Sequence, residues 1–186
     1  MGFQNIFPVP IYTTFLDNKL VEDLEKLVTP RLHNLTLGEE QKTDYHSKDK
    51  ILSPEELSEF FHYIDPIITD YSNKSNLKRS NNINYWVQDY EKNNKHSLHA
   101  HGDSYISGVY YLRANENAGE LSFFNPNPIY TITEFLNGPK NEIYFPVKPL
   151  KGLLVLFPGW LSHEALPSSN DGCIRTCLAF NYEKIK

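Results

Sequence analysis

Three of the seven histidines of the chain lie close together, in the string H-S-L-H-A-H-G-D that starts at His96. Alternate side chains of a β-strand share one face, so His99, His101 and Asp103 would project to the same side about 6 to 7 Å apart. Imidazole and carboxylate groups at that spacing can bind one Fe(II), Zn(II) or Mn(II) ion and leave coordination positions open for a substrate. A polar, solvent-facing strand end is the alternative interpretation.

A fourth histidine and an arginine in an apolar run follow later in the chain. His163 comes after the apolar run 153–157 and a Pro-Gly turn, in the string F-P-G-W-L-S-H-E-A-L-P. Arg175 lies among apolar residues of another strand-like run. A buried arginine is costly unless it is paired. An acidic ligand would satisfy it, and the structural alternative is a salt bridge to Glu164 or to a helix carboxylate.

Two amphipathic helices are predicted before these residues. Residues 17–28 place apolar side chains at helical spacing and end at a Thr-Pro pair. The second helix is predicted to start with a capping box at Ser53 and Glu56 and to reach about residue 72, with a kink or an end at Pro66.

From Ile83 onward the pattern changes to short runs of β-branched and aromatic residues, separated by turn residues. Strands that follow two helices favour a mainly β fold, a sandwich or barrel with the helices packed on one face. A length of 186 residues suits one domain. We expect a single domain over 1–186, in which 1–82 forms a helical support and 83–186 forms the β core.

Composition excludes several classes of protein. The net charge of -5 and the pI near 5.8 give no basic surface for a nucleic-acid partner. No apolar run approaches the ~18 residues that cross a membrane, and residues 1–10 lack the basic and apolar regions of a secretory signal. Cys173 and Cys177 would lie roughly 13 Å apart in a strand, too far for a disulfide. We therefore expect reduced thiols and a cytoplasmic protein.

Five separated elements resemble those of the non-haem Fe(II)- and 2-oxoglutarate-dependent oxygenases. They are His99-x-His101, Ser107 to Leu112, Gly119-x-Leu121-x-Phe123, Gly152 to His163, and Arg175 to Asn181. Within that superfamily the chain is most similar to a small prolyl-hydroxylase-like branch found in marine bacteria and phages, whose N-terminus resembles residues 7–10.

The resemblance implies a double-stranded β-helix, the jelly-roll or cupin-like fold, with Fe(II), 2-oxoglutarate and O₂ as cofactor and co-substrates. It implies that His163 is the distal histidine ligand and that Arg175 receives the distal carboxylate of 2-oxoglutarate, together with the hydroxyl of Tyr111. Such an enzyme converts 2-oxoglutarate to succinate and carbon dioxide while it hydroxylates a C–H bond. Its substrate would be an amino acid, a peptidyl residue such as proline, or a small metabolite.

Two frames compete for the first pair of metal ligands. His101 and Asp103 fit the H-x-D pattern of the wider superfamily, whereas His99 and His101 form the H-x-H pair of the most similar branch. His101 belongs to both frames, so His101 and His163 rank first and Asp103 and His99 rank next. If His99 is not a ligand, it should still line the pocket.

The substrate itself is not indicated by the sequence, nor is an oligomeric state. The stretch 125–141 is too long for a hairpin turn, so we expect a lid that contacts a small-molecule or peptide substrate through Tyr130 and Phe135. Trp160 is expected in the pocket wall.

Three other functions fit parts of the pattern. H-x-H-x-D also opens the zinc site of metallo-β-lactamase-type hydrolases, although Ser104 stands where that fold needs a histidine. A cupin-like dioxygenase or isomerase would work without 2-oxoglutarate and would not need Arg175. A jelly-roll binding module would have no catalytic metal. Metal content separates them, since iron supports the oxygenase, zinc the hydrolase and no metal the binding module.

Overall fold

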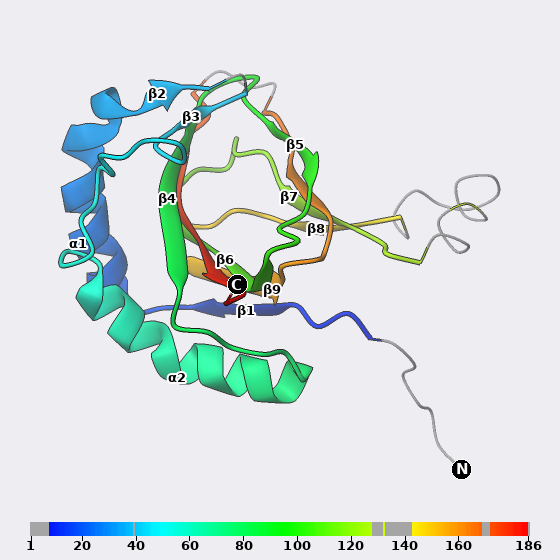
Figure 1. Cartoon of the computed structure of the whole chain (residues 1–186). Coiled ribbons are helices and arrows are strands. Elements are labelled where there is room, and N and C mark those ends of the chain that lie inside the picture. The colour runs from blue at the N-terminus through cyan, green and yellow to red at the C-terminus, as the bar shows by residue number, and fades with distance from the viewer. Residues whose placement is uncertain (1–7, 39, 128–131, 133–142, 169–171, 186) are drawn as a thin grey trace, which may run out of the picture.

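The computed structural model describes residues 8–38, 40–127, 132, 143–168 and 172–185 (Figure 1). The helical elements are α1 (Asn18–Val28), the 3-10 helix η1 (Thr29–Asn34) and α2 (Ser58–Ser75). The strands are β1 (Tyr12–Phe15), β2 (Thr36–Leu37), β3 (Lys42–Thr43), β4 (Ile83–Tyr90), β5 (His96–His99), β6 (Ser104–Ala114), β7 (Leu121–Phe124), β8 (Tyr144–Val147), β9 (Leu153–Pro158), β10 (His163–Ala165) and β11 (Arg175–Glu183).

Two antiparallel sheets face each other in a jelly-roll. The larger sheet has the strand order β1-β9-β6-β11-β4-β3-β2, and the smaller has the order β5-β10-β7-β8. The helices α1 and α2 lie on the outer side of the larger sheet, away from β5, β7 and β8 (Figure 1). The prediction of a mainly β fold with helices packed on one face is therefore confirmed.

The larger sheet separates two apolar clusters. The first lies between the helices and the sheet and includes Phe60 and Ile64 of α2 together with Leu178 and Phe180 of β11. The second lies between the two sheets and includes Cys177 of the same strand. Because side chains alternate along a strand, β11 contributes to both clusters, and its inner face lines the space between the sheets.

Both predicted helices are present, with one shifted boundary. The side chain of Asp17 caps α1 by accepting a hydrogen bond from the backbone N–H of Lys19 at 2.8 Å. The predicted capping box forms, since Ser53 and Glu56 exchange hydrogen bonds of 2.9 and 3.3 Å, but it closes a turn, and α2 begins only at Ser58. The helix also continues through Pro66, where a kink or an end was predicted.

The N-terminal third also supplies strands to the larger sheet. β1 pairs with β9, and β3 pairs with both β2 and β4. β2 and β3 have two residues each, too few for an alternating pattern to be visible in the sequence. No helix among the described residues is long and apolar enough to cross a membrane. Cys173 and Cys177 are both free thiols.

Candidate metal centre

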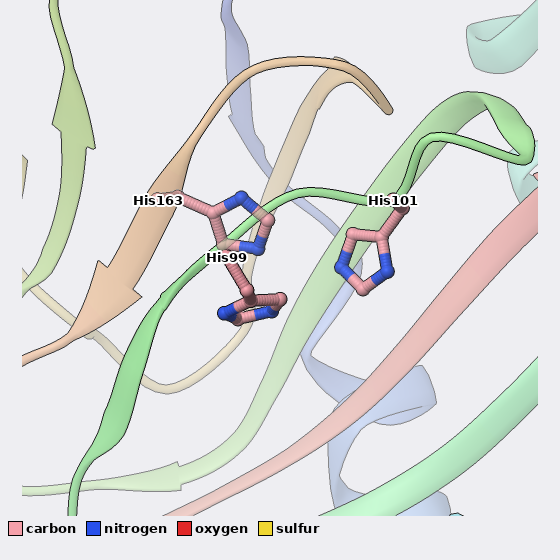
Figure 2. Close-up of side chains that lie close together, drawn as sticks. All are labelled: His99, His101 and His163. Carbon is pink, nitrogen blue, oxygen red and sulfur yellow. The ribbon is translucent and has the colours of Figure 1, made fainter.

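His99, His101 and His163 come together at one end of the space between the sheets (Figure 2). One potential ligand nitrogen of each side chain lies within 4.8 Å of those of the other two. His99 ends β5 and pairs directly with His163 at the start of β10. His101 lies in the turn that follows β5, and its backbone N–H donates to the carbonyl of Gly159 at 2.7 Å. The pairing of β5 with β10 therefore builds the cluster from residues that are distant in sequence.

Backbone carbonyls orient two of the three rings. Nδ1 of His163 donates to the carbonyl of Leu161 at 2.8 Å, and Nδ1 of His99 donates to the carbonyl of Ser97 at 2.7 Å. A ring nitrogen that donates to a carbonyl carries the proton, so Nε2 of each ring is left with its lone pair free. A hydrogen bond from the ring nitrogen that does not bind the ion is the usual way in which proteins orient histidine ligands of a metal.

The third ring is held by a side chain of β11. Asn181, which is buried, contacts Nδ1 of His101 at 3.2 Å and accepts a hydrogen bond from the hydroxyl of Ser107 at 2.7 Å. As placed, the amide nitrogen of Asn181 donates to Nδ1 of His101, which puts the proton of the neutral ring on Nε2. With the amide of Asn181 turned over, its oxygen accepts from Nδ1–H, and Nε2 is then free to bind an ion.

Burial keeps these histidines neutral at pH 7. Desolvation lowers the pKa of His101 to about 4 and the pKa of His163 well below its ordinary value, and the neighbouring histidines lower both further. The pKa of His99 is also lowered, again mainly by burial. Neutral imidazole is the form that binds metal ions, so the cluster is ready to receive a cation without first losing protons.

The pocket that contains the histidines extends to Arg175. This side chain is 2% exposed and lies over the ring of Tyr90, with 3.9 Å between the guanidinium carbon and the ring centroid. Nη1 of Arg175 donates to the carbonyls of Gly119 and Leu166. Nε is buried without a partner, and no carboxylate of the described residues lies within ion-pair distance. In the described part of the chain, the salt bridge considered for Arg175 is therefore absent.

Tyr111 lines the same pocket. It is paired with Cys177 across β6 and β11, two residues along β11 from Arg175. Burial raises the pKa of its phenol far above the ordinary value, so the hydroxyl keeps its proton and can donate a hydrogen bond.

The other residues singled out in the sequence lie elsewhere. Asp103 is exposed in the turn between β5 and β6 and is not part of the histidine cluster. Trp160 is 48% exposed and does not line the pocket of the histidines. Tyr130 and Phe135, like most of the stretch 125–141, lie outside the described residues.

The role of Asn181 was not predicted from the sequence, although this residue ends the last of the five elements that resemble the oxygenases. A signal was present, because Asn181 is a polar residue within a run of apolar residues on β11, where a buried amide needs partners. Nor was Gln88 of β4 predicted, which lines the pocket and contacts Nδ1 of His96 at 3.3 Å.

Comparison with known proteins agrees with the fold and identifies a family. A family model described as "Putative 2OG-Fe(II) oxygenase" matches residues 84–181, and no curated protein sequence shows significant similarity. A prolyl-4-hydroxylase structure from Pseudomonas putida is 18% identical, with a TM-score of 0.69 over 96% of this chain and 94% of that chain. A prolyl hydroxylase from Trichoplax adhaerens, solved with a hypoxia-inducible-factor peptide fragment, is 14% identical, with a TM-score of 0.65 over 93% and 83%. The carbocyclase SnoK of nogalamycin biosynthesis is 12% identical, with a TM-score of 0.67 over 95% and 80%.

The residues of the pocket fit the cofactors of this family, which are Fe(II), 2-oxoglutarate and O₂. Three neutral imidazoles are suitable donors for iron, and the cluster has three histidines where the commoner ligand set has two histidines and one carboxylate. The buried, partnerless Nε of Arg175 fits the carboxylate of a keto acid. The family model spans more than half of the chain, and the protein belongs to the 2OG-Fe(II) oxygenase family.

Proposed function

We propose that the protein is a hydroxylase that couples the oxidative decarboxylation of 2-oxoglutarate to the hydroxylation of a C–H bond. One O₂ supplies both oxygen atoms, so 2-oxoglutarate, O₂ and R–H give succinate, carbon dioxide and R–OH. His99, His101 and His163 would hold the Fe(II), which supplies the oxidative chemistry when it is bound. The substrate would be an amino acid, a peptidyl residue such as proline, or a small metabolite.

The observation that carries this proposal is the presence of two binding groups in one pocket, three histidines at one end and, at the other, an arginine that forms no ion pair with any described carboxylate. A five-carbon keto acid has the matching ends, a keto-carboxylate for the metal and a distal carboxylate for a cation. A metal-dependent hydrolase or a cupin that works without a keto acid would leave the buried charge of Arg175 without a function.

The geometry of Arg175 suits a two-point contact with a carboxylate. Both hydrogen bonds of its guanidinium use Nη1, so the edge formed by Nε and Nη2 makes no hydrogen bond to any described residue. Such an edge can donate two parallel hydrogen bonds to one carboxylate, which are among the stronger hydrogen bonds in proteins. The stacking of the guanidinium on Tyr90 fixes the plane in which this edge lies. The hydroxyl of Tyr111 would donate a third hydrogen bond to the same carboxylate.

A peptide is a reasonable form of the substrate. One structural neighbour, the prolyl hydroxylase from Trichoplax adhaerens, is solved with a peptide fragment.

We also propose that the reaction takes place in the cytoplasm, because Cys173 and Cys177 are both free thiols, as is usual in a reducing compartment.

The test is succinate formation from 2-oxoglutarate by the full chain, with Fe(II) and ascorbate, and with calorimetry of 2-oxoglutarate binding under anaerobic conditions. We expect binding that requires the metal, and succinate release that rises when a suitable substrate is added. Purified protein that binds zinc tightly but does not bind 2-oxoglutarate would contradict the proposal and support a hydrolase. Protein that binds no metal would support a binding module.

A further inference from the structure

A second, wider cavity opens beside the histidine cluster. It has a volume of about 560 Å³, a size typical of ligand sites. Its walls come from Gly38, from residues of the segment 40–46, which includes β3, and from β4, β5 and the two residues that follow β5. The distal end of the keto acid does not account for this space, because Arg175 and Tyr111 do not line it.

The cavity shares a wall with the metal pocket. Trp86, Gln88, His96, His99 and His101 line both spaces. A molecule in the cavity would therefore lie against the side chains that hold the metal, which is where a C–H bond must lie in order to be oxidised. The cavity has the position required of the site for the substrate that is hydroxylated.

The charge of the cavity disfavours a free carboxylate. No lysine or arginine is among the described residues that line it, and the one formally charged side chain is Glu40. The carboxylate of Glu40 is already satisfied, because it accepts hydrogen bonds from the backbone N–H and the hydroxyl of Ser97 and lies 3.7 Å from Nζ of Lys95. A substrate carboxylate would lose its water here without gaining a cation, and that costs free energy.

The polar groups of the cavity suit an amide. The side chain of Gln41 is 7% exposed and makes no hydrogen bond to any described residue. A primary amide is both a donor and an acceptor, as is a peptide group. The pair would complement each other, whereas a carboxylate could use only the donor half of Gln41.

Another part of the cavity wall is aromatic. The rings of Tyr45 and Trp86 meet edge to face, with 4.7 Å between their centroids. Tyr45 is 40% exposed, so its ring still has apolar surface to cover. Nζ of Lys50 lies 5.9 Å from the centroid of the Tyr45 ring, so a second cation at this wall would be repelled. The wall therefore suits an uncharged, apolar side chain or ring.

The wall is held in place before any ligand binds. The buried carboxylate of Asp44 accepts hydrogen bonds from the backbone N–H groups of Val87 and Ile51, both at 2.8 Å. The hydroxyl of Thr43 donates to the carbonyl of Val87 at 3.0 Å. These hydrogen bonds hold the segment that carries Tyr45 against β4, so ligand binding would cost little conformational entropy there.

We infer that the cavity beside the histidines binds the substrate as an uncharged residue in amide linkage, with its apolar side chain on Tyr45 and Trp86 and its amide on Gln41. The inference rests on the proposed function, since it assigns the substrate of the same iron site. It selects residues within a peptide over free amino acids and other small carboxylic acids.

The test compares two matched sets of compounds with the full-length, Fe(II)-loaded protein. One set is the standard amino acids, and the other is the same residues as N-acetyl N-methylamides. Succinate release above the rate without substrate is measured after calorimetry has established 2-oxoglutarate binding. We expect at least one capped residue to exceed its free counterpart by about tenfold or more, the effect of one unsatisfied buried group.

The outcomes separate the two proposals. If free amino acids stimulate as well as their capped forms, or if no capped residue stimulates although 2-oxoglutarate binds, the inference about the substrate is overturned and the oxygenase remains. If 2-oxoglutarate does not bind, both are overturned.

Variants locate the site of the stimulating capped residue. Tyr45→Ala should raise its apparent KM by about tenfold, as expected for the loss of an aromatic contact, while Tyr45→Phe should restore the value. Tyr63→Ala on α2, which removes a ring of similar exposure far from the cavity, is the matched control and should leave the KM unchanged. Affinity for Fe(II) and 2-oxoglutarate should be the same in all three variants. An unchanged KM in Tyr45→Ala, or a loss of 2-oxoglutarate binding in it, would overturn the assignment.

Discussion

The two faces of β11 differ in how completely their side chains are satisfied. Leu178, Phe180 and Tyr182 face the helices and pack in the first apolar cluster. Arg175 and Asn181 face the space between the sheets and carry the polar groups of the pocket. One strand with a period of two residues thus separates the side chains that stabilise the fold from those that would bind cofactors.

The two faces differ in whether a buried polar atom is left without a hydrogen-bond partner. The outer face is complete, because its rings contact one another and the rings of α2, as Phe180 does with Phe60 and Phe61. The inner face has a buried Nε on Arg175 without a partner. A buried polar atom without a partner costs stability, and of the three such atoms among the described residues only Nε of Arg175 belongs to a residue that lines the histidine pocket, where a ligand could complete it.

The largest effect should come from His163, which anchors the metal end of the inner face. We expect His163→Ala to abolish stoichiometric Fe(II) binding, because two remaining imidazoles from one short segment give a poor site, while the folded state is retained. Metal analysis after anaerobic loading measures the Fe(II) stoichiometry, and circular dichroism shows whether the variant is folded. His33→Ala, at an exposed histidine of η1, is the control. Full metal stoichiometry in His163→Ala would refute its assignment as a ligand.

A second pair of variants decides which residue completes the ligand set. We expect His99→Ala to lose most of the affinity for Fe(II) and Asp103→Ala to retain it, because His99 lies in the cluster and Asp103 is exposed outside it. The same metal analysis measures both. The opposite result would restore the H-x-D frame and would require the turn between β5 and β6 to rearrange on metal binding.

A substitution on the outer face of β11 should lower stability and leave the affinities for Fe(II) and 2-oxoglutarate unchanged. Leu178 is fully buried, and Leu178→Ala should lower the free energy of unfolding by about 2 to 5 kcal/mol through the cavity it leaves. Denaturant unfolding measures this loss. Fe(II) and 2-oxoglutarate affinities of the folded variant should match those of the wild type. A marked loss of either affinity at temperatures where the variant is folded would show that the two faces are coupled.

Arg175→Lys tests the inner face of β11 at the end of the pocket opposite the histidines. Lysine keeps the charge but loses the planar edge, so the affinity for 2-oxoglutarate should fall by roughly 10- to 150-fold, which corresponds to about 1.5 to 3 kcal/mol for a charged hydrogen bond. Anaerobic calorimetry with the metal present measures it, and Arg113→Lys on β6 is the control. An unchanged affinity would mean that the distal carboxylate binds elsewhere.

The sequence was most informative where one local signal decides the structure. Alternating and apolar runs located the strands of the β core, and the histidines and Arg175 were identified because their types are unusual in such runs. The choice between His99 and Asp103 could not be made from spacing, since both share the face of an ideal strand with His101. β5 ends at His99, and the turn that follows carries Asp103 away from the cluster.

The cavity beside the histidines was not predictable for a different reason. Part of its wall lies beside β2 and β3, which are too short for a pattern. Asp44 holds that part against β4 through Val87, which is distant in sequence. Tyr45 and Gln41 carry no signal of their own in the sequence. Their roles follow only from the pairing of β3 with β4, a long-range contact.

The smallest effect is expected behind the outer face, at the capping box that precedes α2. Glu56 accepts hydrogen bonds from both terminal nitrogens of Arg31, at 2.9 and 2.7 Å, and from the backbone N–H of Ser53. Hydrogen bonds from Arg31 hold the pKa of Glu56 at about 2, below its ordinary value of 4.5. The pair is partly exposed, so Glu56→Gln should lower stability at pH 7 by only about 1 kcal/mol, or about 2 to 4 °C in Tm.

The dependence on pH distinguishes this ion pair from a packing effect. A carboxyl whose pKa is lower in the folded state binds fewer protons than the unfolded chain between pH 4.5 and about 2, so its contribution is complete above pH 4.5 and is lost as the pH falls toward 2. The Tm of the wild type and of Glu56→Gln should therefore converge over this range. A difference between wild type and Glu56→Gln that persists at pH 2 would assign the effect to packing of the turn. A change in metal affinity in Glu56→Gln would contradict the separation between the helix side and the pocket side of the larger sheet.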